Sequence, residues 1–157
     1  MVEREKEALE KENAAGLRLL ISLLIRFPEI GSLRYLPDSR SLLLHFYVRP
    51  AEDASFDAAT VETVLKNHLT AFLELNREKS EILATGWTPL DGVMRLTLER
   101  DLQSISLHEI SLIITLLNER LGSSLLVEKN LVADDEEMWF QSERFVDGLF
   151  ESLRREG

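Results

Sequence analysis

The chain has 157 residues, of which 45% are hydrophobic and 29% are charged, so it is long enough to bury a core and has the composition of a soluble globular protein. Its 28 acidic and 18 basic residues give a net charge of −10, which disfavours binding to nucleic acid and to anionic membrane surfaces. It has no cysteine, which excludes disulfides, thiolate nucleophiles and cysteine-ligated metals.

The first segment in chain order, residues 1–13, is charged and lacks the apolar stretch of a signal peptide. No apolar stretch of the chain exceeds about ten residues, which is half of the roughly 20 that span a bilayer. We therefore expect one cytoplasmic domain over residues 1–157, with residues 1–13 projecting from its body as a helical extension or fraying.

Residues 2–27 are expected to form one long helix, which Pro28 ends. From Gly16 to Ile25 this helix is apolar around most of its circumference, because its polar residues share one narrow stripe: Arg18, Ser22 and Arg26. A helix of this kind must be buried on most sides, either by its own domain or by a second copy of the chain. Three leucines are therefore predicted to lie at an interface: Leu17, Leu20 and Leu24.

Residues 30–49 and 81–100 are each expected to form a β-hairpin. The first turns at Pro37–Arg40, where proline presets φ and Asp38 can bond its own backbone. The second turns within Thr88–Gly92, which contains a proline and an Asp-Gly step. Apolar residues alternate along the second strand of each hairpin, as in strands that bury one face: Leu42, Leu44, Phe46 and Val48, and then Met94, Leu96 and Leu98.

Amphipathic helices are expected over residues 55–76 and 106–121, because both carry an apolar stripe at helical spacing. Ser55 or Asp57 can cap the first helix. The run Ser106–Glu109 matches the capping box, in which the serine accepts from the amide three residues on and the glutamate reaches back.

A last amphipathic helix is expected over residues 134–155, after a short strand at Leu125–Val127. The acidic run Asp134–Glu137 lies at its start, where carboxylates favour the helix dipole. Adjacent carboxylates can also bind a divalent cation, but this run lacks the ligand spacing of a calcium loop. Aromatic residues of this helix either dock on their own domain or join an interface: Trp139, Phe140 and Phe150.

The expected elements follow the order α-β-β-α-β-β-α-(β)-α. This order predicts an α+β fold, a two-layer sandwich with one antiparallel sheet of four to five strands built from the two hairpins. The two hairpin–helix units also share a weak sequence match, in which Leu65 corresponds to Leu116 and Asn67 to Asn118. An internal duplication is therefore a hypothesis.

The chain lacks the motifs of phosphate-binding loops, H-E-x-x-H metal sites and G-x-S-x-G nucleophile elbows. His45 lies in the middle of a strand beside Tyr47 and has no catalytic partner visible in the sequence. His68 falls at the border of an apolar helix stripe, and His108 falls in the first turn of a helix, where the dipole favours a neutral ring. Trp87 can line a ligand site or cover the edge of the core. The candidate ligand-binding residues are His45, Tyr47 and Trp87, and no catalytic residue, metal site or cofactor is assigned.

Three functions are compatible with these patterns. The first is a non-enzymatic protein–protein interaction or scaffold module that pairs with itself or with another protein, because the apolar helix surface exceeds what one sheet face can cover. The second is a small-molecule sensing or carrier domain with its site between the two hairpin–helix units. The third is a cofactor-independent enzyme that uses a histidine.

Overall fold

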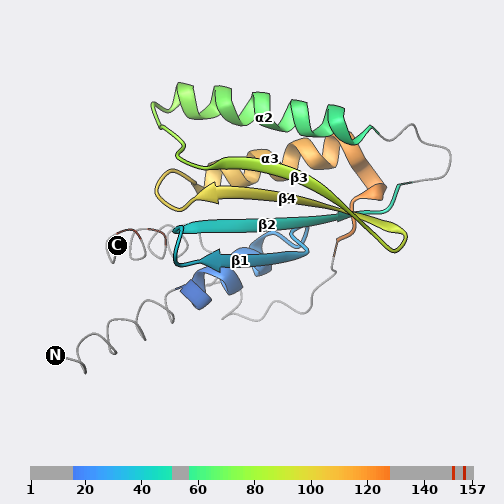
Figure 1. Cartoon of the computed structure of the whole chain (residues 1–157), viewed down its shortest axis with the longest axis horizontal. Coiled ribbons are helices and arrows are strands. Elements are labelled where there is room, and N and C mark those ends of the chain that lie inside the picture. The colour runs from blue at the N-terminus through green and yellow to red at the C-terminus, as the bar shows by residue number, and fades with distance from the viewer. Residues whose placement is uncertain (1–15, 51–56, 128–149, 151–153, 155–157) are drawn as a thin grey trace.

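The computed structural model (Figure 1) describes residues 16–50, 57–127, 150 and 154. Its first helix, called helix 16–26 after the residues described, precedes the first hairpin. The other elements follow in chain order: β1 (Ser32–Leu36), β2 (Ser41–Val48), α2 (Ala58–Leu75), β3 (Leu83–Leu90), β4 (Val93–Asp101), α3 (Leu107–Leu121) and the 3₁₀ turn η1 (Gly122–Ser124). The fold is α+β, as predicted, with a four-strand antiparallel sheet built from two hairpins.

The strands of the sheet lie in the order β1-β2-β4-β3, so the two hairpins meet along β2 and β4. In this central pair His45 lies opposite Thr97. Among the described residues, the expected fifth strand at Leu125–Val127 is reduced to one bridge between Val48 and Leu125. The turn η1 ends at Ser124, directly before this bridge.

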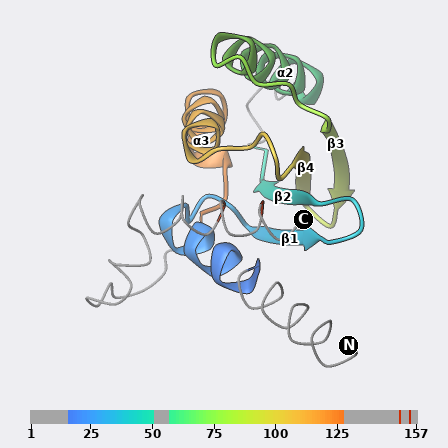
Figure 2. The ribbon, with the colours of Figure 1, turned by 90° about the vertical axis from the view of Figure 1, so that its left-hand side faces the viewer.

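The core lies between the sheet and its helices. Figure 2 shows α2, α3 and helix 16–26 on the same face of the sheet. Alternating strand residues line that face and are buried: Leu33, Leu42, Leu44, Phe46, Val48, Leu96 and Leu98. Among the described helices, none combines the length and apolarity that crossing a membrane requires.

The second hairpin turns later than the sequence predicts. β3 continues through Leu90, and the turn consists of Asp91 and Gly92 alone, with Gly92 at a φ of 73°. Glycine adopts a positive φ without steric cost, which suits Gly92 to the second position of this turn. Thr88 and Pro89 therefore lie in β3, where proline is tolerated because β3 is an edge strand.

The helix starts follow the predicted capping residues. The carboxylate of Asp57 accepts the N–H of Thr60 at 3.3 Å at the start of α2. The hydroxyl oxygen of Ser106 accepts the N–H of Glu109 at 3.2 Å at the start of α3. The second half of the expected capping box does not form, because the Glu109 carboxylate binds Arg100 instead.

Helix 16–26 is buried on one side and exposed on the other. Three of its residues are fully buried: Leu19, Ser22 and Leu23. On the opposite side Leu17 is 59% exposed and Ile21 is 42% exposed. The placement of Ser22 on the polar stripe is wrong, because Ser22 is buried. Its hydroxyl donates to the carbonyl oxygen of Arg18 at 2.7 Å, and this hydrogen bond replaces one to water.

Candidate functional site

The three residues of the expected ligand site lie on different faces of the sheet. His45 and Tyr47 alternate with buried core residues along β2 and point to the face opposite the helices, here called the outer face. Trp87 lies on the helix-covered face, where its indole N–H donates to the carbonyl oxygen of Ala58 at 3.0 Å. The structure therefore does not bring the three together.

His45 lies at the centre of the outer face. Its Nδ1 is 2.9 Å from the hydroxyl oxygen of Thr97, and 8% of the residue is exposed. Burial lowers the pKa of His45, and the charges of Arg95 and Arg34 lower this pKa further. The ring is therefore neutral at neutral pH, and it contacts a hydroxyl where a catalytic base would contact an orienting carboxylate.

Tyr47 has a packing role at the start of β1. A Cβ atom at Gly31 would lie 2.1 Å from the Cδ2 atom of the Tyr47 ring, so only glycine fits beneath it. The Tyr47 hydroxyl oxygen lies 3.1 Å from the hydroxyl oxygen of Ser32. These contacts hold the chain before β1 against β2, which explains Tyr47 without a ligand.

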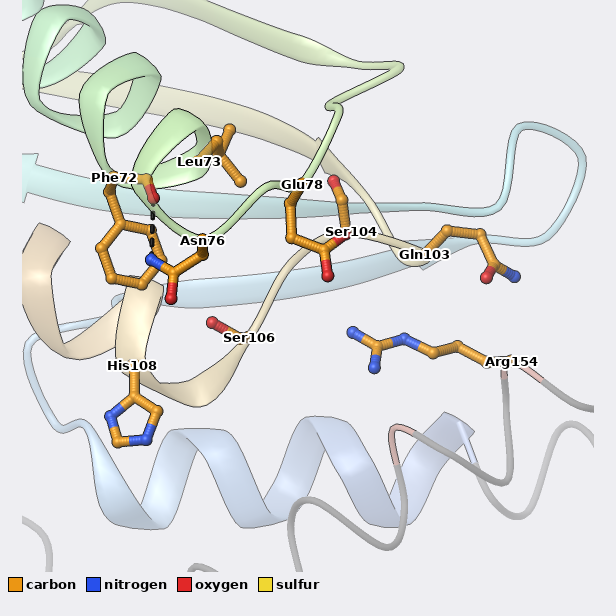
Figure 3. A pocket seen from close by; sticks show the side chains of 9 residues that line it. All are labelled: Phe72, Leu73, Asn76, Glu78, Gln103, Ser104, Ser106, His108 and Arg154. Atoms are coloured by element: carbon orange, nitrogen blue, oxygen red, sulfur yellow. Dashed lines mark hydrogen bonds between the residues drawn. The ribbon is translucent and has the colours of Figure 1, made fainter.

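A cavity of about 380 Å³ lies where the C-terminal end of α2 meets the loop between β4 and α3 (Figure 3). Aromatic and aliphatic side chains from α2 form one wall, and serine hydroxyls from the loop form another. Arg154 reaches the cavity from the C-terminal part of the chain. The lining residues are Phe72, Leu73, Asn76, Glu78, Gln103, Ser104, Ser106, His108 and Arg154.

Arg154 is held in place by the loop that borders the cavity. Its Nε–H donates to the carbonyl oxygen of Leu102 at 2.9 Å, and its Nη2–H donates to the carbonyl oxygen of Ile105. Figure 3 shows its guanidinium group extending into the cavity. The cavity thus has a fixed cationic group, with apolar surface from α2 beside it.

A buried ion pair lies directly behind the cavity wall. Arg100 and Glu109 are both fully buried, and they are joined by two bonds, from Nε–H at 2.6 Å and from Nη2–H at 2.8 Å. The remaining Arg100 donors reach Asp101, the Ile82 carbonyl oxygen and the Ser104 hydroxyl. All five guanidinium N–H groups are therefore satisfied, as a buried arginine requires.

The environment shifts the pKa values of the two carboxylates in opposite directions. Burial raises the pKa of Glu109, and its bonds to Arg100 offset only part of that rise. Burial also acts to raise the pKa of Asp101, but hydrogen bonds from Ser104 and Ile82, with the charge of Arg100, outweigh it and lower this pKa. The cluster therefore ties β4, the following loop and α3 together, and no acid–base role is needed to explain it.

The predicted interface residues have different environments. Leu17 is exposed, whereas Leu20 and Leu24 are half-buried against the core. Phe150 packs in the core of its own chain, where 2% of it is exposed. Trp139 and Phe140 lie outside the described residues.

Within the residues that the structure describes, no group of three or more histidine, aspartate or glutamate side chains is arranged to hold a metal ion. The acidic run Asp134–Glu137 lies outside those residues. No protein-family model, curated protein or solved structure matches the chain.

Proposed function

We propose that this chain is a non-enzymatic protein–protein interaction module that associates with a second copy of itself through helix 16–26. The observation that carries this proposal is the apolar side of that helix. Leu17 and Ile21 lie one helical turn apart and are 59% and 42% exposed. Leu24 lies at the margin of the same side and is half-buried. These residues form the surface called the helix 16–26 stripe.

The opposite side of the helix fixes this stripe in place. Leu19 and Leu23 are fully buried in the core, so the helix cannot rotate to hide Leu17 without exposing them. Arg18 is the one charged residue on the exposed side of the described helix. Two copies related by a twofold axis can therefore pack their stripes together with little charge to desolvate.

Light scattering after size exclusion tests the proposal with the double variant Leu17→Glu and Ile21→Glu. We expect wild-type protein to have a mass above the 18.0 kDa of one chain at micromolar concentration, and the double variant to lose the stripe-mediated association. Leu75→Glu is a matched control, because Leu75 is 84% exposed on α2. A wild-type chain that stays monomeric, or a double variant with the mass of wild type, would contradict the proposal.

A second candidate function is a small-molecule carrier or sensor, which the cavity beside Arg154 favours. Its volume of about 380 Å³ falls in the range that ligand pockets occupy, and its lining combines apolar groups with the fixed cation of Arg154 and the carboxylate of Glu78. A small ligand whose carboxylate or phosphate pairs with Arg154 and lies away from Glu78 would match this chemistry.

A thermal-shift screen with amino acids, dicarboxylates and sugar phosphates tests this candidate, since a ligand that binds only the folded chain raises its Tm. The expected hit raises the Tm of wild type and of Arg77→Ala, but not of Arg154→Ala. Arg77 is a nearby exposed arginine that does not line the cavity. A panel without a hit, or a hit that Arg154→Ala retains, counts against the cavity as the site.

A further inference from the structure

β3 forms one border of the sheet and, apart from Pro89, its own residues lack the features that usually protect an edge strand. Natural edge strands avoid unwanted pairing by being short or by carrying charged residues. β1, at the other border, has five residues and contains the exposed Arg34. β3 has eight residues, Leu83–Leu90, and none of them is charged. Its only protective residue is Pro89, near the hairpin tip.

The hairpin turn determines which backbone groups of β3 point away from the sheet. Leu90 lies opposite Val93 across a two-residue turn, so these two residues form backbone hydrogen bonds with each other. Alternate residues along β3 bond β4 in the same way, and the residues between them direct N–H and C=O to the free edge. Leu83 and Thr85 belong to the second set. Among the described residues, no backbone hydrogen bond outside the β3–β4 ladder involves either of them.

Among the residues that the structure describes, no contact within one copy explains why residue 86 is a glycine. A Cβ atom at this position would meet none of the described residues within 4 Å, and its φ lies outside the positive region that favours glycine. A glycine inside a strand is costly, since it gives up side-chain packing and loses more entropy on folding. Its neighbours on the outer face, Ala84 and Thr88, are small as well. A strand glycine without a local role is typical of a place where another backbone approaches closely.

From these observations we infer that β3 pairs antiparallel with β3 of a second copy, about a twofold axis close to Gly86. The pairing joins the sheets into one of eight strands, four from each copy. Because β3 has no charge, no register places like charges opposite each other, although each chain has a net charge of −10. Gly86 removes the side chains that would otherwise meet at the axis.

The β3–β3 contact uses the same surface on both copies, so it joins two copies and leaves no free β3 edge for a third. A pairing of β3 with β1 of the next copy would be head-to-tail and could continue into a fibre. The short length of β1 and the charge of Arg34 disfavour that arrangement. The β3 edge and helix 16–26 are different surfaces, so this inference does not depend on the helix contact, and both contacts together would produce assemblies larger than a dimer.

Gly86→Lys tests the β3 contact, because it affects the single chain and the pair in opposite ways. The open space at Gly86 accommodates a side chain, so we expect the melting temperature of the dilute monomer to be unchanged or raised. In the pair, two lysines would face each other across the axis and separate the copies. Ser123→Lys, at an exposed position outside the sheet, adds the same charge as a control.

Light scattering is measured for Gly86→Lys alone and together with Leu17→Glu and Ile21→Glu. We expect Gly86→Lys to lower the mass of the otherwise wild-type chain to that of a dimer and the mass of the helix double variant to that of a monomer, with no change for Ser123→Lys. If the helix variants leave the mass unchanged and Gly86→Lys lowers it, the β3 contact stands and the helix contact fails. If Gly86→Lys leaves the mass unchanged in both backgrounds, the β3 contact is overturned. Ala84→Lys, at an exposed position of the same strand, gives the same decision if Gly86→Lys does not fold.

Discussion

At the scale of single residues, the Arg100–Glu109 pair constrains the fold by joining two elements inside the core. Both side chains are fully buried, and the two bonds between them connect the end of β4 to the first turn of α3. An isolated charge at either position would be very costly in this apolar setting. The loop between β4 and α3 is therefore fixed by a charged clamp, and Ser104 links this clamp to the cavity.

Removing one partner of this pair is expected to be far more damaging than replacing both. Arg100→Met leaves the Glu109 and Asp101 carboxylates buried without their cation, which we expect to lower the free energy of unfolding by about 3–5 kcal/mol. The double variant Arg100→Met and Glu109→Leu removes the main unpaired charge and is expected to lose less. Urea denaturation of both variants measures the difference, and a double variant that is less stable than Arg100→Met would contradict this account.

The sequence of β4 contains a signal for this pair. Arg100 continues the inward-facing series of Leu96 and Leu98 along β4, and a charge in that series must find a buried partner. Glu109 could not be identified as the partner, because its spacing from Ser106 also fits a capping box. Which of the two roles it takes depends on how closely α3 approaches β4, and that is a tertiary property.

At the scale of secondary-structure elements, the backbone at the C-terminal end of α2 is strained, because Arg77 adopts a positive φ there. The N–H of Glu78 bonds the carbonyl oxygen of Leu73 at 2.9 Å, and the N–H of Arg77 bonds that of Glu74 at 3.1 Å. These are the two bonds of a Schellman motif, which places Arg77 at the position that glycine usually occupies. Its φ of 55° is unfavourable for a residue with a Cβ atom.

Arg77→Gly is therefore expected to stabilise the protein by about 1 kcal/mol, since glycine adopts a positive φ without steric cost. Arg77→Ala keeps the Cβ atom and should give no such gain. Thermal and urea unfolding of the two variants provide the comparison. Equal stability of Arg77→Gly and Arg77→Ala would show that the backbone at this position carries no strain.

Local sequence patterns predicted which helices and strands form better than they predicted where these elements end and which side of each is buried. The alternation along β2 and the stripe of α2 follow from burial of one side, and both were correct. The turn of the second hairpin was misplaced, because Pro89 indicates a turn in sequence and yet is tolerated on an edge strand. The buried side of helix 16–26 was misplaced at Ser22, because a serine that bonds its own helix can be buried.

The cavity could not have been predicted from such patterns. Its walls come from α2, the loop after β4 and Arg154, which are far apart in the sequence. His108 lines it, but only as one of nine residues, and its position in the first turn of α3 carries no indication of a cavity. Sites of this kind depend on how elements pack, which single-sequence periodicity does not report.

At the scale of the whole molecule, the two hairpins have an approximate twofold relationship. His45 and Thr97 are opposite one another in the central strand pair and are 52 positions apart in the chain. A local axis through this pair relates each residue of β2 to the residue of β4 at that same spacing, and it places β1 and β3 at equivalent borders. This arrangement agrees with an internal duplication, which stays a hypothesis.

The same local axis gives β1 and β3 equivalent positions at the two borders of the sheet, but the two strands differ in length and charge. β1 is short and carries Arg34, whereas β3 is longer and uncharged. Helix 16–26 presents the apolar stripe of Leu17 and Ile21 on a further surface. The proposed function rests on helix 16–26, and the β3 edge is a second surface proposed for self-association independently of it.

The most direct test of this central claim follows the accessibility of position 17 as the copies associate. The chain has no cysteine, so Leu17→Cys introduces a single thiol whose rate of modification by a maleimide can be measured. We expect this rate to fall as protein concentration rises through the association range, while the rate for Leu75→Cys stays constant. A rate for Leu17→Cys that is independent of concentration, in protein whose mass shows that it has associated, would contradict the claim that helix 16–26 forms the contact.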